Sequence, residues 1–312
     1  MPRKTSVVKT GFKGFDGLAG GLRGSELLCI ASRPAQGKTA LALGMAARLA
    51  LAKKPRPVLF FSLGMSRARV MRRLLAARSR VPLDRLRAGT FTGSRLKDIA
   101  RASRTLDEAP LRIVDGCRDL EEIARISRRL ASKLRSEGLR LGLIVIDSLQ
   151  RIGGEEGASA LSAAEELKRL AVETDASMLL VSQVGRSAAG IDADEDRPRL
   201  SDRINGPSGA KGAKASELAR LCDRLAFLRR GSGWWPPGAA GRAPARARKG
   251  DVWLLGGKTY LGGKLVRRDG EPVGPVEVEI ILAKNARGRT GTASLKFDRE
   301  TSRFLRGSQI LS

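Results

Sequence analysis

Short stretches that are apolar at nearly every position alternate along this chain with longer stretches whose apolar residues recur every three or four positions. The first kind is typical of strands buried on both faces of a parallel sheet, and the second of helices that cover such a sheet. In residues 120–136, for example, Ile123, Ile126, Leu130 and Leu134 fall on one helical face. The alternation predicts a doubly wound α/β domain with a central, mostly parallel sheet flanked by helices. The predicted strands are 27–31, 58–63, 111–115, 143–147, 178–182, 225–228 and 276–282, and the predicted helices are 38–52, 67–78, 120–136 and 159–173.

Two regions depart from this pattern. Residues 186–216 are polar, first acidic and then rich in Gly, Lys and Arg, which predicts a long mobile loop. Residues 231–275 are rich in Gly, Pro, Ala and Arg, which predicts an inserted segment, flexible over 238–250 and with a small hairpin at 252–266. The sequence shows no internal repeat. We therefore expect residues 1–312 to form a single domain that carries this insertion near its C-terminal end.

Length and composition narrow the class of protein. The chain of 312 residues is 42% hydrophobic, which suits a globular protein with a buried core. The sequence has no apolar run near the roughly 18 residues that span a bilayer, and its N-terminal charges precede no apolar segment. We therefore expect a cytoplasmic protein with no membrane contact. With no histidine and only three distant cysteines (Cys29, Cys117 and Cys222), the sequence excludes His-based catalysis and gives no sign of a CxxC zinc site or a disulfide framework.

Charge is the strongest compositional signal. Lys and Arg number 59 against 32 Asp and Glu, a formal net charge of +27. Such an excess favours a polyanionic partner, most simply nucleic acid. Arginine supplies 43 of the 59 cations and alanine is abundant, so a GC-rich coding sequence is an alternative source of the excess.

A phosphate-binding loop is the clearest candidate site. Residues 32–39 have the sequence SRPAQGKT, directly after one predicted strand and before a predicted helix, which is the context that a P-loop requires. In such a loop backbone N–H groups surround the phosphates, Lys38 reaches the β- and γ-phosphates, and the hydroxyl of Thr39 binds Mg²⁺. Ser32 stands where the usual pattern has its first glycine. The predicted nucleotide-binding residues are Ser32, Arg33, Pro34, Ala35, Gln36, Gly37, Lys38, Thr39 and Ala40.

Two later strands also end in polar side chains. The apolar run 143–147 ends in Asp147, the arrangement that holds Mg²⁺ in P-loop ATPases. Together with the P-loop it predicts a site for ATP and Mg²⁺. Gln183 follows strand 178–182, at the end of the strand where α/β sheets bind ligands, and is placed to sense the γ-phosphate. A glutamine that merely begins a loop is the alternative.

The combination of these motifs resembles the C-terminal RecA-like motor domain of the DnaB-type replicative helicases. The similarity spans about residues 8–304 and extends to FSLGMS at 61–66, IDSLQ at 146–150, KNARG at 284–288 and SRF at 302–304. The resemblance implies a RecA-like P-loop fold and a homo-oligomer, a ring-shaped hexamer with ATP bound between subunits. It also implies single-stranded DNA in a basic central channel and ATP-dependent translocation or unwinding of DNA in replication. A primase contact cannot be inferred without the N-terminal domain of those helicases.

One departure from the family falls on the water-activating residue. Gly64 stands where the family has a glutamate that activates the attacking water. Help of this kind typically contributes about 10²–10⁴ in rate, so we expect slow hydrolysis unless another carboxylate replaces it. Glu155 and Glu156, which follow the strand of Asp147, are the candidates in the sequence.

A second departure concerns the groups that reach a neighbouring subunit's nucleotide. When Lys284 is aligned with the family's lysine, Ala286 takes the position of the arginine finger, and Arg287 follows one residue later. On a strand, a shift of one residue points the side chain to the other face, so Arg287 would need a bulge or loop to serve. The resemblance thus gives Lys38, Asp147, Gln183, Lys284 and Arg287 as the catalytic set, with Thr39 and Asp147 as Mg²⁺ ligands.

The third departure lies at 213–220, where the family has an acidic, Gln-containing turn next to its DNA-contacting loops. Trp234 and Trp235 offer rings for base stacking, although a small core within the insertion is the simpler interpretation. Three hypotheses stay open: a working ATP-dependent DNA helicase, a relative that binds ATP and DNA without efficient hydrolysis, and a recombinase-like or clock-ATPase-like RecA-fold protein. The cations expected to contact DNA phosphates, unless they only form a solvated basic loop, are Arg197, Arg199, Arg203, Lys211 and Lys214.

Overall fold

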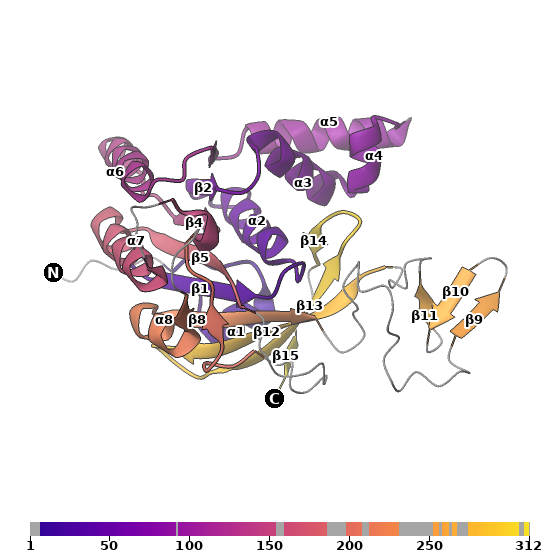
Figure 1. Ribbon diagram of the computed structural model, residues 1–312. Helices are drawn as coiled ribbons and strands as arrows, with labels where there is room; N and C mark the ends of the chain where they lie inside the picture. Colours follow the sequence, from indigo (N-terminus) through magenta and orange to yellow (C-terminus); the bar gives the residue numbers. More distant parts are fainter. Residues whose placement is uncertain are drawn as a thin grey trace.

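A twisted sheet of ten strands forms the centre of the molecule (Figure 1). The computed structural model describes residues 7–91, 93–153, 159–185, 198–207, 212–230, 252–255, 258–261, 264–266, 274–305 and 309–311. The strand order is β14-β13-β12-β8-β1-β5-β4-β2-β3, with β15 paired to β13. The six strands from β8 to β3 are parallel, which confirms the predicted sheet. These strands are β1 (Leu27–Ser32), β2 (Val58–Ser62), β3 (Leu111–Asp115), β4 (Leu143–Asp147), β5 (Ser177–Gln183) and β8 (Arg224–Arg230).

The C-terminal strands continue the sheet in the opposite direction. β12 (Val276–Asn285) pairs antiparallel with β8, and β13 (Gly291–Asp298) pairs antiparallel with β12. β14 (Arg303–Phe304) and β15 (Gln309–Leu311) both pair with β13. As a result, the C-terminal end of β12 lies beside the N-terminal ends of the parallel strands.

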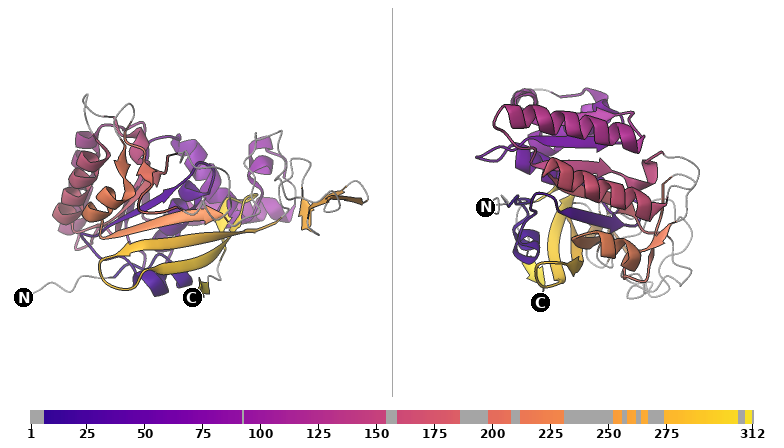
Figure 2. Two further views of the ribbon diagram at one scale, coloured as in Figure 1. Left: turned by 60° about the horizontal axis from the view of Figure 1, so that its bottom comes forward. Right: turned by 90° about the vertical axis from the view of Figure 1, so that its left-hand side faces the viewer.

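Helices cover both faces of the sheet, since the parallel strands are apolar on both (Figure 2). Along β1, Leu28 and Ile30 face one helical layer while Leu27 and Cys29 face the other. The first layer holds α1 (Lys13–Ala19), α2 (Lys38–Ala50), α3 (Arg67–Ser79) and α5 (Ser94–Asp107), with α4 (Leu83–Ala88) against α3. The second holds α6 (Leu120–Ser136), α7 (Ala160–Thr174) and α8 (Ala215–Leu221), and the 3-10 turn η1 (Leu149–Arg151) follows β4. Within the described ranges, the structure has no helix long and apolar enough to cross a membrane.

The polar regions contain more structure than their composition predicts. The expected long loop at 186–216 was wrong for its described parts, because β6 (Arg203–Ile204) pairs with β7 (Ala213–Lys214) and α8 follows at once. Ile204, Ala213 and Ala215 are buried and hold this unit on the α7 side of the sheet. The hairpin expected at 252–266 is a three-stranded antiparallel sheet, while 238–250 lies outside the described residues. Its strands are β9 (Val252–Leu255), β10 (Lys258–Leu261) and β11 (Lys264–Val266).

Candidate nucleotide site

The P-loop leaves the carboxyl end of β1 and turns directly into α2. Ala35 and Gly37 both have left-handed backbone angles, with φ of 61° and 99°, and these bend the chain around the future phosphate position. A Cβ atom at Gly37 would lie 3.4 Å from the ring of Phe304 and 3.5 Å from that of Phe297. These two rings stack 4.6 Å apart behind the loop. The positive φ angle favours glycine at position 37, and the two rings would lie in ordinary contact with a Cβ atom there.

The side chain of Gln36 supports the loop from inside. It is 6% exposed, and its Oε1 accepts a 2.7 Å hydrogen bond from the backbone N–H of Arg230 at the end of β8. Ala40 is buried under the first turn of α2. These two predicted nucleotide-binding residues thus have buried side chains, and what they offer a ligand is their backbone. The hydroxyl of Ser32 likewise donates to the carbonyl of Arg33 at 2.9 Å.

Lys38, Thr39 and Asp147 come together at the carboxyl edge of the sheet, as the sequence predicts. Asp147 ends β4 opposite Ser62 of β2, is 7% exposed, and accepts a hydrogen bond from the hydroxyl of Thr39. Burial raises the pKa of Asp147 above its ordinary value, although Thr39 and the nearby charge of Lys38 oppose the change. Burial lowers the pKa of Lys38, and Asp147 opposes that change too.

This set of groups suits ATP with Mg²⁺. Two hard oxygen donors, the Thr39 hydroxyl and the Asp147 carboxylate, are joined to each other, and a divalent cation prefers such donors. Burial raises the pKa of Asp147 despite the contacts from Thr39, Lys38 and Arg73, and a bound cation would favour its charged form. The backbone N–H groups of the loop and the start of α2 supply an anion-binding end for phosphates.

A polar network lies next to this site. Gln183 is paired with Ser32 in the β1–β5 register, so it stands at the edge of the P-loop as predicted. The side-chain amide of Gln150 donates to the hydroxyl of Ser182 at 2.8 Å and to the carbonyl of Asn205 at 2.7 Å. Asn205 donates its backbone N–H to the carbonyl of Gln183 at 2.9 Å. The network therefore joins the segment after Asp147, the end of β5 and the β6–β7 unit.

Sequence reasoning missed two contributors to the site. In the sequence Gln150 is only the last residue of a family-like segment, and its linking role depends on three elements that are distant along the chain. Arg73 of α3 lies close enough to Asp147 for their charges to interact, and burial lowers its pKa, with the nearby charges of Arg69 and Arg87 adding to the effect. The run of cations in α3 gives no sign of which one turns toward the site, so no local signal could have identified Arg73.

The position of Gly64 leaves the site without a carboxylate in the expected place. Gly64 is exposed just after β2, and a Cβ atom there would lie 3.7 Å from Cγ and Nε of Arg151. Asp115 ends β3, the strand that pairs with β2. Its Oδ2 accepts a 2.6 Å hydrogen bond from the backbone N–H of Arg67 at the start of α3. Glu155 and Glu156 lie outside the described residues.

Lys284 and Arg287 lie at the other end of the parallel strands from the P-loop, beside the amino end of β8. Lys284 of β12 pairs with Leu225 of β8. The preceding residue of β8, Arg224, pairs with Leu28 near the start of β1. Leu28 is four residues from Ser32, so about 13 Å of strand separates that end from the P-loop. The ammonium group of Lys284 donates to the carbonyls of Ala219 and Cys222, the latter at 2.8 Å. Neither side chain can therefore serve its own chain's nucleotide.

Arg287 follows the end of β12 and is held by a buried carboxylate. Its Nε donates to Oε1 of Glu26 at 2.6 Å, and Glu26 also accepts from Nη1 of the buried Arg224 at 2.5 Å. Burial alone would raise the pKa of Glu26, but the hydrogen bonds from Arg224, the backbone of Arg23 and Arg287 outweigh it, so the pKa is lowered. Arg287 lies in the turn after β12, so the alternation of side chains along a strand does not fix its direction. The register shift in β12 falls between Leu282 and Lys284, ahead of both Lys284 and Arg287, and does not alter their relative positions.

The cations expected to contact DNA are only partly described. Arg203 and Lys214 are exposed and face each other in the β6–β7 register, and Arg199 is exposed just before them. The guanidinium of Arg203 donates to the carbonyl of Gly212 at 3.0 Å. The backbone of Arg203 is joined to the segment just after β5, because Gly185 donates its N–H to the carbonyl of Arg203 at 2.8 Å. Arg197 and Lys211 lie outside the described residues, as do Trp234 and Trp235.

Comparisons with known proteins agree with this geometry. Residues 7–230 match the model of the DnaB-like helicase C-terminal domain family. The chain is 32% identical over 302 residues to the replicative DNA helicase DnaB of Treponema pallidum, covering 96% of this chain and 56% of that protein. It is 28% identical over 309 residues to the replicative DNA helicase DnaC of Bacillus subtilis, again covering 96% and 56%. The chain thus spans about half the length of these curated relatives.

Solved structures show the same fold at lower identity. A DnaB-like replicative helicase, described together with its interactions with primase, superposes with a TM-score of 0.71 at 21% identity, over 97% of this chain and 62% of that one. A separately solved ATPase domain gives 0.70 at 21% identity, over 97% of this chain and 92% of that one. A KaiC-like protein from Pyrococcus horikoshii gives 0.51 at 14% identity. These likenesses show the RecA-like fold.

Proposed function

We propose that this chain, which belongs to the DnaB-like helicase C-terminal domain family, is a motor domain that binds ATP, Mg²⁺ and single-stranded DNA and moves along or unwinds DNA in replication. The observation that carries the proposal is the meeting of Lys38, Thr39 and Asp147 at the carboxyl edge of the sheet, below a glycine-dependent phosphate loop. The family supplies the reaction class, and the site supplies the groups that this class needs.

In this proposal different residues of the chain bind the phosphates and the Mg²⁺. The P-loop N–H groups and Lys38 hold the phosphates, while Thr39 and Asp147 hold the Mg²⁺, which offsets phosphate charge when bound. Lys38 is half-buried and Asp147 is buried, which strengthens these charge interactions because less water screens them. Arg73 adds a second positive charge on the side of α3.

The same geometry supports a link between nucleotide and DNA. Gln183 stands beside the P-loop, and its carbonyl holds Asn205 at the end of β6. Gln150 ties Asn205 to Ser182. A movement of Gln183 in response to the γ-phosphate would therefore be passed to β6–β7, the unit that carries two of the proposed DNA-contacting cations.

The placement of Lys284 and Arg287 supports an oligomer in which a second copy completes the site. Both side chains lie at the edge of the sheet opposite their own P-loop, so a role at phosphate requires a neighbouring subunit. A closed ring, such as the hexamer expected from the family, would give every copy such a neighbour. Arg287 is the more available of the two, since 58% of its side chain is exposed.

A second candidate function is nucleotide-dependent DNA binding without efficient hydrolysis, as a scaffold or regulator. Gly64 favours it, because a glycine cannot activate water and the nearby carboxylate of Asp115 is used at the start of α3. The groups that bind nucleotide are retained in this chain, whereas the groups that would speed hydrolysis are missing or displaced.

Steady-state ATP hydrolysis by the purified protein, with and without single-stranded DNA, tests the proposal. Lys38→Ala serves as the blank, because loss of the phosphate-binding cation should remove nucleotide binding under either candidate. DNA-stimulated turnover near about 1 s⁻¹ or above, the low end of ordinary enzymes, supports the motor. Turnover equal to the blank with ATP still bound supports the second candidate. Failure to bind ATP at all would contradict both.

A further inference from the structure

A basic groove lies between α6 and the edge strand β3, apart from the nucleotide site. Its volume is about 440 Å³, and it is lined by Arg112, Arg125, Ile126, Arg129, Leu130 and Lys133. Arg112 comes from β3, the last strand of the sheet, and the other five come from α6. The lining thus contains four cations and no acidic residue, and it shares no residue with the nucleotide site or with β6–β7.

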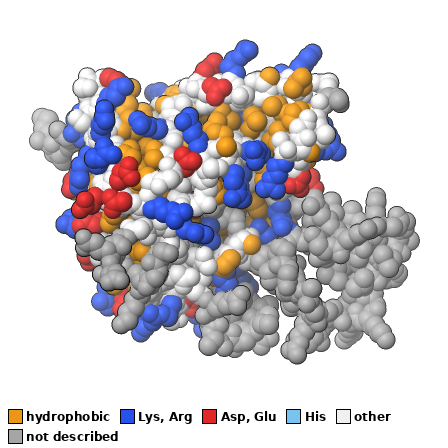
Figure 3. Space-filling model, turned by 45° about the horizontal axis from the view of Figure 1, so that its top comes forward, with side chains coloured by type: hydrophobic (Ala, Val, Ile, Leu, Met, Phe, Trp, Pro, Cys, Tyr) orange, Lys and Arg blue, Asp and Glu red, His pale blue; other side chains and the backbone are white. Residues whose placement is uncertain are grey.

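The four cations are arranged as a row rather than scattered. Arg125, Arg129 and Lys133 recur every four residues on α6, so successive side chains rise by about 6 Å along one helix face. All three, and Arg112 across the groove, are exposed. On the face drawn in Figure 3, Lys and Arg side chains lie among apolar atoms, with acidic side chains between some of them. A row of this kind matches a ligand that repeats its negative charge along a line.

Little within the described part of the chain neutralises these charges. Arg125 lies 3.6 Å from Glu122 and Lys133 lies 3.9 Å from Glu137, and both pairs are exposed, where such pairs contribute little. Arg112 and Arg129 have no ion pair among the described residues. The groove therefore concentrates positive charge that the fold does not use.

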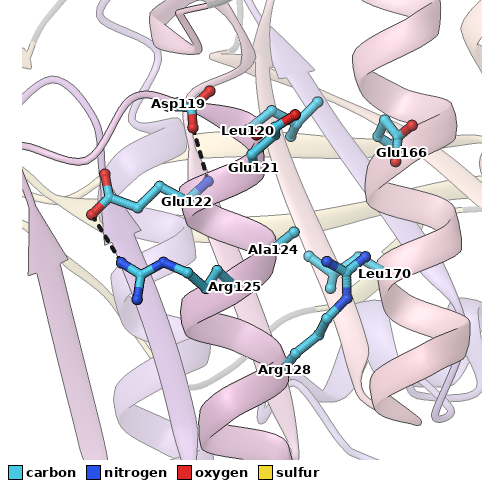
Figure 4. A pocket seen from close by; sticks show the side chains of 9 residues that line it. All are labelled: Asp119, Leu120, Glu121, Glu122, Ala124, Arg125, Arg128, Glu166 and Leu170. Atoms are coloured by element: carbon cyan, nitrogen blue, oxygen red, sulfur yellow. Dashed lines mark hydrogen bonds and ion pairs between the residues drawn. The ribbon is translucent and has the colours of Figure 1, made fainter.

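The neighbouring groove between α6 and α7 differs because acidic and basic side chains line it together. Asp119, Glu122 and Glu166 line it together with Arg125 and Arg128 (Figure 4). There acidic side chains stand among the cations in the lining itself, and Glu122 donates its N–H to Asp119. Arg128 pairs with a carboxylate of α7 at 2.7 Å. That groove gives no preference for an anion, whereas the β3–α6 groove does.

The floor of the β3–α6 groove is apolar. Ile126 and Leu130 are partly buried and pack on the core of the α6–α7 layer, with one face toward the groove. Single-stranded nucleic acid offers unpaired bases that can lie on apolar or guanidinium surfaces while the phosphates meet cations. A run of acidic residues alone would use the cations but would have no apolar group to lie on this floor.

We propose that the β3–α6 groove is a second contact for single-stranded DNA, bound through its sugar-phosphate backbone without sequence preference. Arg112 and Arg129 hold phosphates from the two walls, and Arg125 and Lys133 extend the contact along α6. The proposal depends on the proposed function only in the class of ligand, since the groove needs neither ATP nor the P-loop. Its role would be to hold DNA on the body of the domain while β6–β7 responds to nucleotide.

Fluorescence anisotropy with a labelled dT₂₀ oligonucleotide, in the absence of nucleotide and over a range of salt concentrations, tests this inference on the full chain. The test variant is Arg112→Gln with Arg129→Gln, and the matched control is Arg95→Gln with Arg101→Gln on α5, which removes equal charge from exposed positions. Loss of two phosphate contacts should flatten the slope of log K against log salt by about 1.4 and weaken binding about tenfold or more at 0.1 M salt. The control should change both values much less.

Equal slopes and affinities for the test variant and the wild-type protein would overturn the groove while leaving the proposed function intact. An equal loss in the two double variants would also overturn it, because the effect would then be one of net charge alone. No binding of dT₂₀ by the wild-type protein without nucleotide would overturn the groove. The DNA part of the proposed function would be contradicted only if binding were also absent with ATP and Mg²⁺. Binding of poly-glutamate with no binding of dT₂₀ would replace the proposal with an acidic protein partner. Photo-crosslinking of the oligonucleotide to the peptide containing residues 112–133 is the expected positive result.

Discussion

Replacing Gly64 by glutamate tests whether a single missing carboxylate limits this protein. The backbone at Gly64 is not left-handed, and a Cβ atom there meets only Arg151, at 3.7 Å, so a side chain fits without moving the backbone. The exposed position should therefore accept Gly64→Glu with unchanged folding. If the carboxylate activates water, ATP turnover should rise by about 10²–10⁴, which corresponds to roughly 3–5 kcal/mol of barrier.

Arg151 decides how much of this gain is seen. Its Nε lies 3.7 Å from the position of the new Cβ, so it can pair with the introduced carboxylate and turn it away from the nucleotide. An exposed pair of this kind contributes at most about 1 kcal/mol, equivalent to about a fivefold loss in rate. The gain from a general base is much larger, so Gly64→Glu alone should still show it. Adding Arg151→Gln to Gly64→Glu should raise turnover by up to a further fivefold, because the new carboxylate then has no arginine to pair with.

The assay is steady-state phosphate release with single-stranded DNA present, and Gly64→Gln is the control because it has the same size without a base. Nucleotide affinity should be similar in the two variants, so the difference should be in kcat. The reasoning is refuted if Gly64→Glu is no faster than Gly64→Gln while both bind ATP, with or without Arg151→Gln. In that case turnover is limited elsewhere, such as by the contribution of a neighbouring subunit.

Three further changes test the electrostatics of the molecule. Asp147→Asn should raise the melting temperature of the nucleotide-free protein at neutral pH and abolish Mg²⁺-dependent ATP binding. Because the pKa of Asp147 is raised, this stabilisation should shrink as pH falls through the folded pKa and vanish below the unfolded pKa; calorimetry from pH 3 to 8 measures this. Glu26→Gln should cost about 3 kcal/mol in urea unfolding at pH 7, since it leaves the buried Arg224 uncompensated. The pKa of Glu26 is lowered, so this difference should persist above about pH 5 and shrink as pH falls toward its folded pKa. Gln150→Leu should keep ATP binding but remove the hydrogen bond that holds Asn205. Amide hydrogen exchange without ATP should therefore become faster in and just after β6, and unchanged exchange would contradict the proposed link.

The local elements followed directly from the sequence where apolar runs had sharp boundaries. Strands β3 and β4 and helix α6 have the predicted bounds, because Asp115, Asp147 and Asp119 mark their ends with polar or capping side chains. α4 and α5 were not predicted, since they are rich in charge and bury little, with Ala102 and Leu106 the buried residues of α5. The β6–β7 unit was missed because its strands are only two residues long, too short for any periodicity.

The sequence by itself determined the parallel core, the P-loop and the meeting of Lys38 with Asp147, because both lie at strand ends that a parallel sheet must bring to one edge. Only the tertiary structure decided that Gln36 turns inward, that Arg73 reaches the site, and that Arg287 is clamped at the opposite edge. Those placements come from pairing between segments far apart in the chain, above all the antiparallel addition of β12 to β8. Local periodicity carries no information about such long-range partners, since it reports only which face of an element is buried.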